Sequence, residues 1–358
     1  MNNGRYSHTA TPITRRIQQL GIAAGVLLCA SAQAQESIAR AYILQYHHIS
    51  DETPRSTSTA PDLFRQHMNF IAENGYQVLP LAEIIRTLQE GGGLPEKTVA
   101  LTFDDGYKSI YETAYPLLKE RGYPFTIFLN PDALDNHRST HITWEQAREM
   151  GKHGGVVANH GLGHIHMVEV KPSEDASAWR ARMTQNIEQA EKRIEEETGA
   201  SLKLLAYPYG EYDASLQKLV SSLGYVGLGQ HSGPIGPDSD WTSLPRFPAS
   251  NAYSSVPQLK EKLSTLPLPA QMLSPQNILI ADNNPPQLRF STELNAKVTC
   301  YGSGQGLLDS AVDNNEVTVV GVAPFKGRRF RYNCTAPAGG GLFYWRSFPW
   351  INPAIPED

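Results

Sequence analysis

The chain has 358 residues, of which 40% are hydrophobic and 19% are charged, and its formal net charge is −5. This is an ordinary globular composition, long enough for a large core and for a second, smaller domain. The weakly negative charge provides no basic stripe, so nucleic acid is not expected as a partner.

The N-terminus is predicted to be a secretory signal peptide. Three arginines, the last of them Arg16, precede the short apolar run LGIAAGVLLCASAQAQ, which contains Ala32–Ala34. A positive flank, a short apolar run and an Ala-x-Ala site are typical of a signal peptide, here residues 1–34. The run is short for a bilayer span, so no transmembrane anchor is expected after cleavage. We therefore expect an exported protein, periplasmic or secreted.

Strand-like and helix-like segments alternate from Ala39 to about Gln230. Thr143 and Gln146, for example, have capping-box spacing at the start of one predicted helix. Repeated strand–helix alternation predicts a parallel sheet, either open or closed into a barrel. Strands are expected at 39–47, 99–103, 124–129, 155–160, 202–210 and 225–230, and helices at 61–75, 81–93, 109–122, 143–154, 174–198 and 213–224.

The sequence changes character after about Pro267. The segment LPLPAQMLSPQ (266–276) is typical of a linker, and from Ile278 onward short segments of alternating polarity predominate. We therefore expect a first domain at 35–270 and a small antiparallel β domain at 278–358.

The cysteines are consistent with export. Cys29 leaves with the predicted signal peptide, so Cys300 and Cys334 remain. Two cysteines in an oxidising compartment most simply form a disulfide. A loop of that size would stabilise its domain by roughly 4 kcal/mol.

Side chains that can bind a metal or move protons stand at the ends of several predicted strands. The carboxyl ends of parallel strands meet at one edge of the sheet, where α/β folds place their sites. We therefore expect these residues to form one functional site. They are His47 and His48 on the first strand, Asp104 and Asp105 on the next, His160 on another, and Tyr207–Gly210 on a fourth.

Asp104 and Asp105 are adjacent at the end of the apolar strand in ALTFDDGY. A helix cap would explain one of the two acids and would leave the other in apolar surroundings. The pair becomes tolerable if a metal neutralises one carboxylate while the other serves as a base. A glycosidase pair is excluded, because sequence neighbours cannot flank a sugar bond. We assign Asp105 as the ligand and Asp104 as the base.

The segment NHGLGHIHM supplies the other candidate ligands. His160 and His164 are separated by two glycines, which indicates a loop rather than a helix. With Asp105 they form a two-histidine, one-carboxylate set that leaves metal positions open for water and substrate. His166 is an alternative to His164. Taken alone, the segment could also be three surface histidines near a turn.

Three motifs, TFDDGY, NHGLGH and AYPYGEY, resemble in order and spacing the first three motifs of the polysaccharide deacetylases, carbohydrate esterase family four. The resemblance covers about Tyr42 to Phe247 and implies a distorted (β/α) barrel of the NodB type. It implies that Asp104 is the general base. It further implies a divalent metal, usually zinc, bound by Asp105, His160 and His164.

Further roles follow from the resemblance. The backbone N–H of Tyr209 would stabilise the oxyanion, with Pro208 beside it in the substrate-binding segment. The opening QYHHIS is similar to the subgroup that acts on poly-N-acetylglucosamine, which implies His47 as the catalytic acid. His48 is expected to be structural, because successive residues of a strand point to opposite faces.

The sequence departs from the family pattern at several places, one of which is the absence of the family's fifth motif, leucine-x-leucine-x-histidine; this absence favours His47 as the acid. Gly161 stands where a Ser or Thr is usual, and Ala206 stands where an Arg often steadies the base. Arg246, in SLPRFP, is a candidate to replace that arginine. DSDW, which ends at Trp241, is similar to the fourth motif, so Trp241 is added as a substrate-binding candidate.

The expected function is metal-dependent removal of acetyl groups from N-acetylglucosamine units of a polysaccharide. An acid at His47 favours N-deacetylation, because an amine anion cannot leave unprotonated. The alternatives are an O-acetyl esterase on xylan or another acetylated glycan, and a catalytically silent carbohydrate-binding protein. The aromatic run at 343–350 could stack on sugars, although such residues more often form core.

Overall fold

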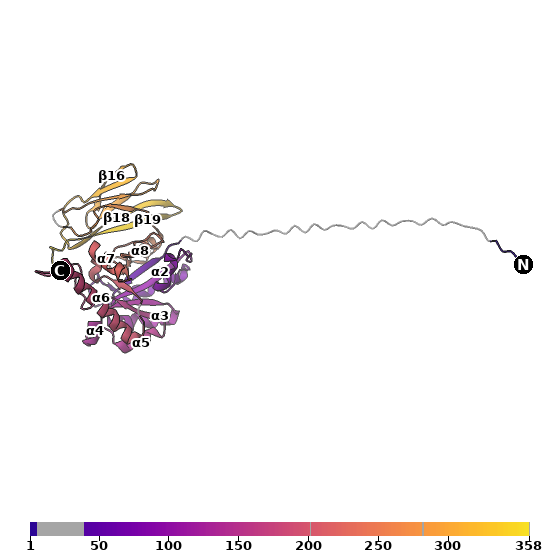
Figure 1. Ribbon diagram of the computed structural model, residues 1–358, viewed down its shortest axis with the longest axis horizontal. Coiled ribbons are helices and arrows are strands. Elements are labelled where there is room, and N and C mark those ends of the chain that lie inside the picture. Colours follow the sequence, from indigo (N-terminus) through magenta and orange to yellow (C-terminus); the bar gives the residue numbers. More distant parts are fainter. Residues whose placement is uncertain (6–38, 201, 281–282, 358) are drawn as a thin grey trace. The chain divides into compact units, whose positions relative to one another are not determined.

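The computed structural model describes residues 1–5, 39–200, 202–280 and 283–357 (Figure 1). The predicted signal peptide therefore lies outside the described residues, apart from its first five. The chain divides into two units, 1–36 and 37–358, and the second contains all of the helices and strands described below.

A parallel sheet of eight strands forms the first part of this unit in the described chain. The strand order is β10-β1-β5-β6-β7-β8-β9, with β4 also paired to β5. Residues of β1 and β6 are buried throughout, as expected for a parallel sheet covered on both faces. The strands are β1 (Tyr42–Tyr46), β4 (Gln77–Val78), β5 (Thr98–Asp105), β6 (Phe125–Leu129), β7 (Gly155–Asn159), β8 (Leu204–Ala206), β9 (Val226–Leu228) and β10 (Phe247–Pro248).

The sheet curves into an incomplete barrel. After β9 the chain returns beside the sheet, where Leu244 forms a parallel bridge with Leu228 and Ile235 an antiparallel bridge with Ala41. The segment between the two outermost strands thus covers part of the gap. This resolves the choice left open by the sequence in favour of the distorted (β/α) barrel.

Helices cover the sheet (Figure 1). The capping box predicted from Thr143 and Gln146 is present at the start of α5. The helix predicted at 109–122 is a π-helical turn, η1, that continues into α3. The helices are α1 (Pro61–Glu73), α2 (Leu81–Gln89), η1 (Ile110–Ala114), α3 (Tyr115–Arg121), α4 (Pro131–Asp135), α5 (Trp144–Gly151), α6 (Ala176–Thr198), α7 (Ala214–Ser222) and α8 (Val256–Lys262). None of the described helices is long and apolar enough to span a membrane.

The C-terminal region is built from two further sheets, in the orders β11-β19-β18-β14-β15 and β12-β13-β17-β16. Their pairs are antiparallel except β11 with β19. The predicted disulfide joins Cys300 of β14 to Cys334 of β18. The strands are β11 (Thr265–Pro267), β12 (Gln271–Ser274), β13 (Gln287–Ser291), β14 (Thr299–Gly302), β15 (Gly306–Leu307), β16 (Asp309–Asp313), β17 (Glu316–Val320), β18 (Arg329–Gly339) and β19 (Leu342–Ile351).

The barrel and the β region are joined by a continuous interface. The segment 266–276, expected to be a linker, instead contributes β12 and most of β11, and β11 pairs with β19. Ile278 and Ile351 pack in the same apolar cluster as Tyr207 and Leu216 of the barrel. The β region is therefore packed against the barrel and contacts the segment that carries the AYPYGEY motif.

Two further strands, β2 (His48–Ile49) and β3 (Ser58–Thr59), form a short parallel pair above the end of β1. The aromatic run of the β region is partly core, since Trp350 and Phe348 are buried in its main apolar cluster.

Candidate metal and catalytic site

Three neighbouring strands place the candidate ligands at one edge of the barrel. Asp105 ends β5 and is in register with Leu129 of β6, which is in register with Asn159 of β7. His160 follows β7 directly, and its N–H donates to the Leu129 carbonyl at 3.1 Å. The carboxylate and the first histidine therefore lie side by side because of strand register, although 55 positions separate them in the sequence.

Asp105, His160 and His164 converge on a common point. Oδ1 of Asp105 lies 3.3 Å from Nε2 of His160 and 3.2 Å from Nε2 of His164. One ligand atom from each residue lies within 4.8 Å of the other two. Two imidazole nitrogens and one carboxylate oxygen at this spacing can hold a divalent cation.

The hydrogen bonding of His160 tests whether this group suits a cation. Its Nδ1 lies 2.7 Å from the carbonyl oxygen of Ala206, which can only accept, so Nδ1 carries a proton. Its Nε2 is buried and forms no hydrogen bond. In neutral His160 this nitrogen presents a lone pair toward the acceptor oxygen of Asp105, and a cation between the two atoms would satisfy both. The residues present therefore fit a metal ion.

The electrostatics agree with this reading. Burial by itself raises the pKa of Asp105, but its contacts with His160 and His164 outweigh that effect and hold the pKa well below the usual value. Burial also works against charge on His160, yet the two neighbouring aspartates raise its pKa. The site thus favours positive charge beside an ionised Asp105.

The site is assembled from backbone segments in the left-handed region. Asp105, His164 and Tyr209 have φ values of 71°, 50° and 59°. Each such conformation costs a non-glycine residue about 1–3 kcal/mol and persists where its surroundings enforce it. The His164 loop is held from α6 by Asn186, whose side chain donates to the Leu162 carbonyl at 2.7 Å and accepts from the Leu162 N–H at 3.0 Å.

Gly161, the departure from the family's usual Ser or Thr, has a packing reason. Its φ is +71°, and a Cβ at this position would lie 2.5 Å from the Cε of Met167 and 3.1 Å from Oδ1 of Asn186. A larger residue would therefore require Met167 or Asn186 to move. Its N–H is fixed by Oδ1 of Asn159 at 2.8 Å.

Asp104 is fully buried and bound by an arginine. Arg246 donates from Nη1 to Oδ1 at 2.6 Å and from Nη2 to Oδ2 at 2.8 Å, and Gln45 donates to Oδ2 at 2.7 Å. Burial raises the pKa of Asp104, but the charges of Arg246, His160 and His47 together with the Arg246 hydrogen bonds outweigh burial, and the pKa is lowered. Arg246 therefore lies where it can replace the arginine absent at Ala206. Gln45 was missed, although a glutamine inside the apolar strand YILQY was a usable signal.

His47 and His48 diverge at the end of β1. Nε2 of His47 lies 3.8 Å from Oδ2 of Asp104. The ring of His48 stacks on Tyr107 with 3.5 Å between ring centres, and burial lowers the pKa of His48 to about 4. His47 therefore lies beside the candidate base, whereas His48 packs against the turn that follows β5.

The AYPYGEY motif lies against the histidine loop. Pro208 begins a short 3₁₀ turn, η2 (Pro208–Gly210), and is buried. The Tyr209 ring contacts His164, with ring centres 4.5 Å apart. It also stacks on His166, with ring centres 3.9 Å apart and an angle of 8° between the ring planes. Trp241, in contrast, packs with the apolar cluster that includes Leu244 and is not among the residues brought to the triad.

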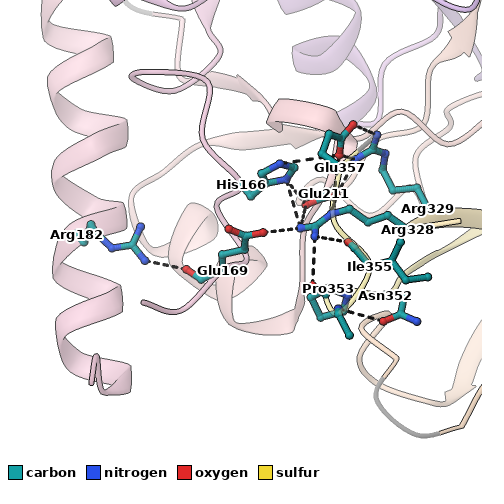
Figure 2. Close-up of polar contacts among 11 residues, drawn as sticks. His166, Glu169, Arg182, Glu211, Arg328, Arg329, Asn352, Pro353, Ile355 and Glu357 are labelled. Carbon is teal, nitrogen blue, oxygen red and sulfur yellow. Dashed lines mark hydrogen bonds and ion pairs between the residues drawn. The ribbon is translucent and has the colours of Figure 1, made fainter. Parts of the chain in front are cut away.

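A second group of histidine and carboxylates is linked to the first through the Tyr209 ring, which contacts both His164 and His166; Figure 2 shows this second group. Ligand atoms of His166, Glu211 and Glu357 also lie within 4.8 Å of one another. Here, however, two arginines bind the buried Glu211. Nε of Arg328 donates to Oε1 of Glu211 at 2.6 Å, and Nη1 of Arg329 donates to the same oxygen at 2.9 Å. The two guanidinium groups already supply the positive charge, so this group does not fit a metal ion. The sequence alone does not indicate this cluster, because its members lie far apart in the chain.

The curved parallel barrel thus carries, at the carboxyl ends of its strands, a group that can hold a cation beside an arginine-bound aspartate, an arrangement that a metal-dependent hydrolase requires. Residues 91–228 match the Polysaccharide deacetylase family. The chain is also 30% identical over 220 residues to the Bacillus subtilis polysaccharide deacetylase YxkH, covering 61% of this chain and 75% of that protein. The chain belongs to the polysaccharide deacetylase family.

More specific relatives carry a substrate in their names. The poly-β-1,6-N-acetyl-D-glucosamine N-deacetylase of Escherichia coli K12 is 26% identical over 277 residues, which cover 67% of this chain and 40% of that protein. The enzyme of the same name from Staphylococcus aureus MRSA252 is 24% identical over 207 residues, which cover 56% of this chain and 71% of that protein. The chain thus spans less than half the length of the E. coli enzyme.

Solved structures support the fold. The Streptococcus pyogenes deacetylase PplD in complex with acetate superposes with a TM-score of 0.57 at 23% identity, covering 63% of this chain and 99% of that one. IcaB from Ammonifex degensii superposes with a TM-score of 0.55 at 22% identity, and the match covers 63% of this chain and 97% of that one. Both agreements concern the barrel architecture.

Proposed function

We propose that the protein is a metal-dependent deacetylase that removes acetyl groups from N-acetylglucosamine units of a polysaccharide. One observation carries the proposal: a triad suited to a cation lies directly beside an aspartate that an arginine keeps ionised. Membership of the deacetylase family and the names of the E. coli and S. aureus relatives support the substrate class.

The proposed metal is zinc, held by Asp105, His160 and His164. Two imidazole nitrogens and a carboxylate suit Zn²⁺, and three protein ligands leave a position open for water or substrate. When bound, the ion supplies Lewis acidity to the acetyl carbonyl and lowers the pKa of its water. The Ala206 carbonyl fixes the His160 ring so that Nε2 faces Oδ1 of Asp105, where the two atoms would hold the ion.

Asp104 acts as the general base. The two-pronged Arg246 contact and the Gln45 amide orient its carboxylate and keep it ionised. Arg246 and Gln45 take three of the four acceptor positions of the carboxylate, which leaves one on Oδ1 for a proton. In this state it accepts the proton of the attacking water as the carbonyl carbon is attacked.

His47 acts as the general acid. It lies beside Asp104 and is 17% exposed, so it is accessible to substrate. It donates a proton to the leaving nitrogen, and the amine leaves neutral. An ester needs this proton less, because an alkoxide leaves more easily than an amine anion.

The backbone N–H of Tyr209 stabilises the oxyanion. The left-handed conformation at Tyr209 and the preceding Pro208 set the direction of this segment. The substrate is an acetylated polysaccharide, and the protein acts outside the cytoplasm, in the periplasm or secreted, as the N-terminal sequence predicts.

The test is acetate release from two polymers. Purified protein with added zinc is incubated with an N-acetylglucosamine polymer and with O-acetylated xylan, alongside the Asp104→Asn variant. We expect acetate from the first polymer, little from the second, and none above background from the variant. Preferential release from xylan would replace the N-deacetylase assignment with an esterase, and no release from either would reject both.

A further inference from the structure

The β region contacts the catalytic segment through two arginines. Arg329 is the first residue of β18 and Arg328 directly precedes it, and both bind Glu211, the residue that follows η2 (Figure 2). Glu211 is fully buried and also accepts from Nδ1 of His166 at 2.8 Å. Burial raises the pKa of Glu211, but Arg328 and His166 outweigh it and the pKa is lowered, so Glu211 is ionised.

Arg328 connects this point to the chain's last described residues. Its Nη1 donates to the carbonyls of Pro353 at 3.3 Å and Ile355 at 2.9 Å, and its Nη2 donates to Glu169 at 2.9 Å. Arg329 pairs with Glu357. The C-terminal segment thereby packs beside the barrel edge that carries the site.

From Glu211 the contacts continue into the site itself. His166 stacks on the Tyr209 ring, and the guanidinium of Arg329 lies 5.4 Å from the centre of the same ring. Tyr209 in turn packs against the metal-ligand candidate His164. Tyr209 has a φ of 59°, a left-handed conformation that is unfavourable for a non-glycine residue, so this turn depends on its surroundings to hold it.

Resting on the proposed function, we propose that Arg328 and Arg329 are positioning residues for deacetylation. They hold Glu211 and the Tyr209 ring, and so fix the direction of the Tyr209 N–H toward the developing oxyanion. The β region is then a working part of the active site rather than a separate attachment. Arg328 provides the buried anchor, and the more exposed Arg329 acts on the ring directly.

The predicted effect is confined to turnover. A donor that acts on the oxyanion contributes in the transition state, so its misplacement lowers kcat and leaves KM nearly unchanged. The metal ligands are held by β5, β7 and Asn186, so metal content should not change. A contact that only stabilised the fold would alter thermal stability and would leave the kcat of the folded protein intact.

The experiment compares Arg329→Met with Arg329→Lys and a control, Arg289→Met. Arg289 pairs with Glu316 at 2.5 Å between β13 and β17 of the same region, and the pair is similarly exposed. With an N-acetylglucosamine oligomer and bound zinc, we expect Arg329→Met to lower kcat about tenfold with KM within twofold. Lysine should restore part of the loss, and the control should match the wild type. A kcat within twofold of wild type in folded Arg329→Met would overturn the proposal.

A second measurement separates this proposal from the proposed function. The ¹⁹F resonance of 3-fluorotyrosine at position 209 reports on the ring whether or not acetate is released. We expect it to shift in Arg329→Met and not in Arg289→Met. An unmoved resonance in both would reject the positioning role, whereas a shifted resonance in a protein that releases no acetate would reject only the deacetylase assignment.

Discussion

Two groups of histidine and carboxylate lie side by side at the barrel edge, supplied in part by the same loop. His164 belongs to one and His166 to the other, and each group has ligand atoms within 4.8 Å of one another. In the described part of the chain, the ion pairs of Asp105 are with His160 and His164, whereas Glu211 is paired with Arg328 and Arg329.

Spacing alone therefore does not define a metal site. Neutral imidazoles do not neutralise a carboxylate, so a carboxylate between two of them can still bind a cation. A carboxylate bound by two guanidinium groups is already neutralised. Asp104 follows the same rule, because the Arg246 ion pair already supplies its positive charge, which is consistent with its proposed role as a base rather than a metal ligand. The nearest arginines decide which carboxylate can bind a cation.

The sharpest way to break this comparison is to remove one histidine from each group. His160→Ala should abolish zinc binding and lower acetate release at least about a thousandfold, because the metal stabilises the transition state by several kcal/mol. His166→Ala should retain one zinc per chain. Metal analysis of both purified variants checks this, and equal zinc loss in the two would show that the groups are not distinct.

Arg246→Met tests whether the arginine makes Asp104 a base. It leaves a buried carboxylate unpaired, so we expect about 3–5 kcal/mol of destabilisation and a loss of kcat of about a hundredfold. Urea unfolding and steady-state kinetics measure the two effects. The double variant Asp104→Asn with Arg246→Met removes both charges and should regain stability but not activity. If the double variant were no more stable than Arg246→Met alone, the unpaired charge would not be the cause.

His47→Gln distinguishes the two histidines that follow β1. General acid catalysis contributes about 10²–10⁴-fold, so hydrolysis of an N-acetyl substrate should fall at least about a hundredfold. Hydrolysis of an O-acetyl ester should fall much less, since its leaving group needs less protonation. His48→Gln is the matched control and should retain most activity on both. Equal losses on amide and ester would argue against His47 as the acid.

A smaller effect comes from a histidine outside both groups. His67 is buried between the Tyr46 hydroxyl at 3.1 Å and the Ser254 carbonyl at 2.5 Å, and burial lowers its pKa from 6.5 to about 4. Between these values the unfolded chain binds a proton that the folded chain does not. His67 therefore contributes full stability above pH 6.5, and its contribution falls by about 2 kcal/mol between pH 7 and pH 5.

Urea unfolding at both pH values tests this, with His67→Gln and the exposed His137→Gln as a control. Between pH 7 and pH 5, the free energy of unfolding of His67→Gln should fall by about 2 kcal/mol less than that of the wild type. The free energy of unfolding of His137→Gln should fall by the same amount as that of the wild type. An unchanged pH dependence in His67→Gln would assign the acid sensitivity to other groups.

The sequence determined much of this site. Apolar strands ending in Asp104–Asp105 and in His160 predicted a shared edge, because parallel strands align their carboxyl ends. The disulfide between Cys300 and Cys334 was likewise predicted and is present. These features depend on residue type and on the local order of strands and helices, which a single sequence displays directly.

Tertiary structure alone decided the rest. The segment 266–276 forms strands because β11 finds its partner in β19, about 80 residues later, which local composition cannot indicate. The Glu211 cluster joins residues 117 positions apart. The sequence displays each charge but not its distance from the others, and in a buried site that distance determines whether a carboxylate binds a cation, accepts a proton or holds a loop.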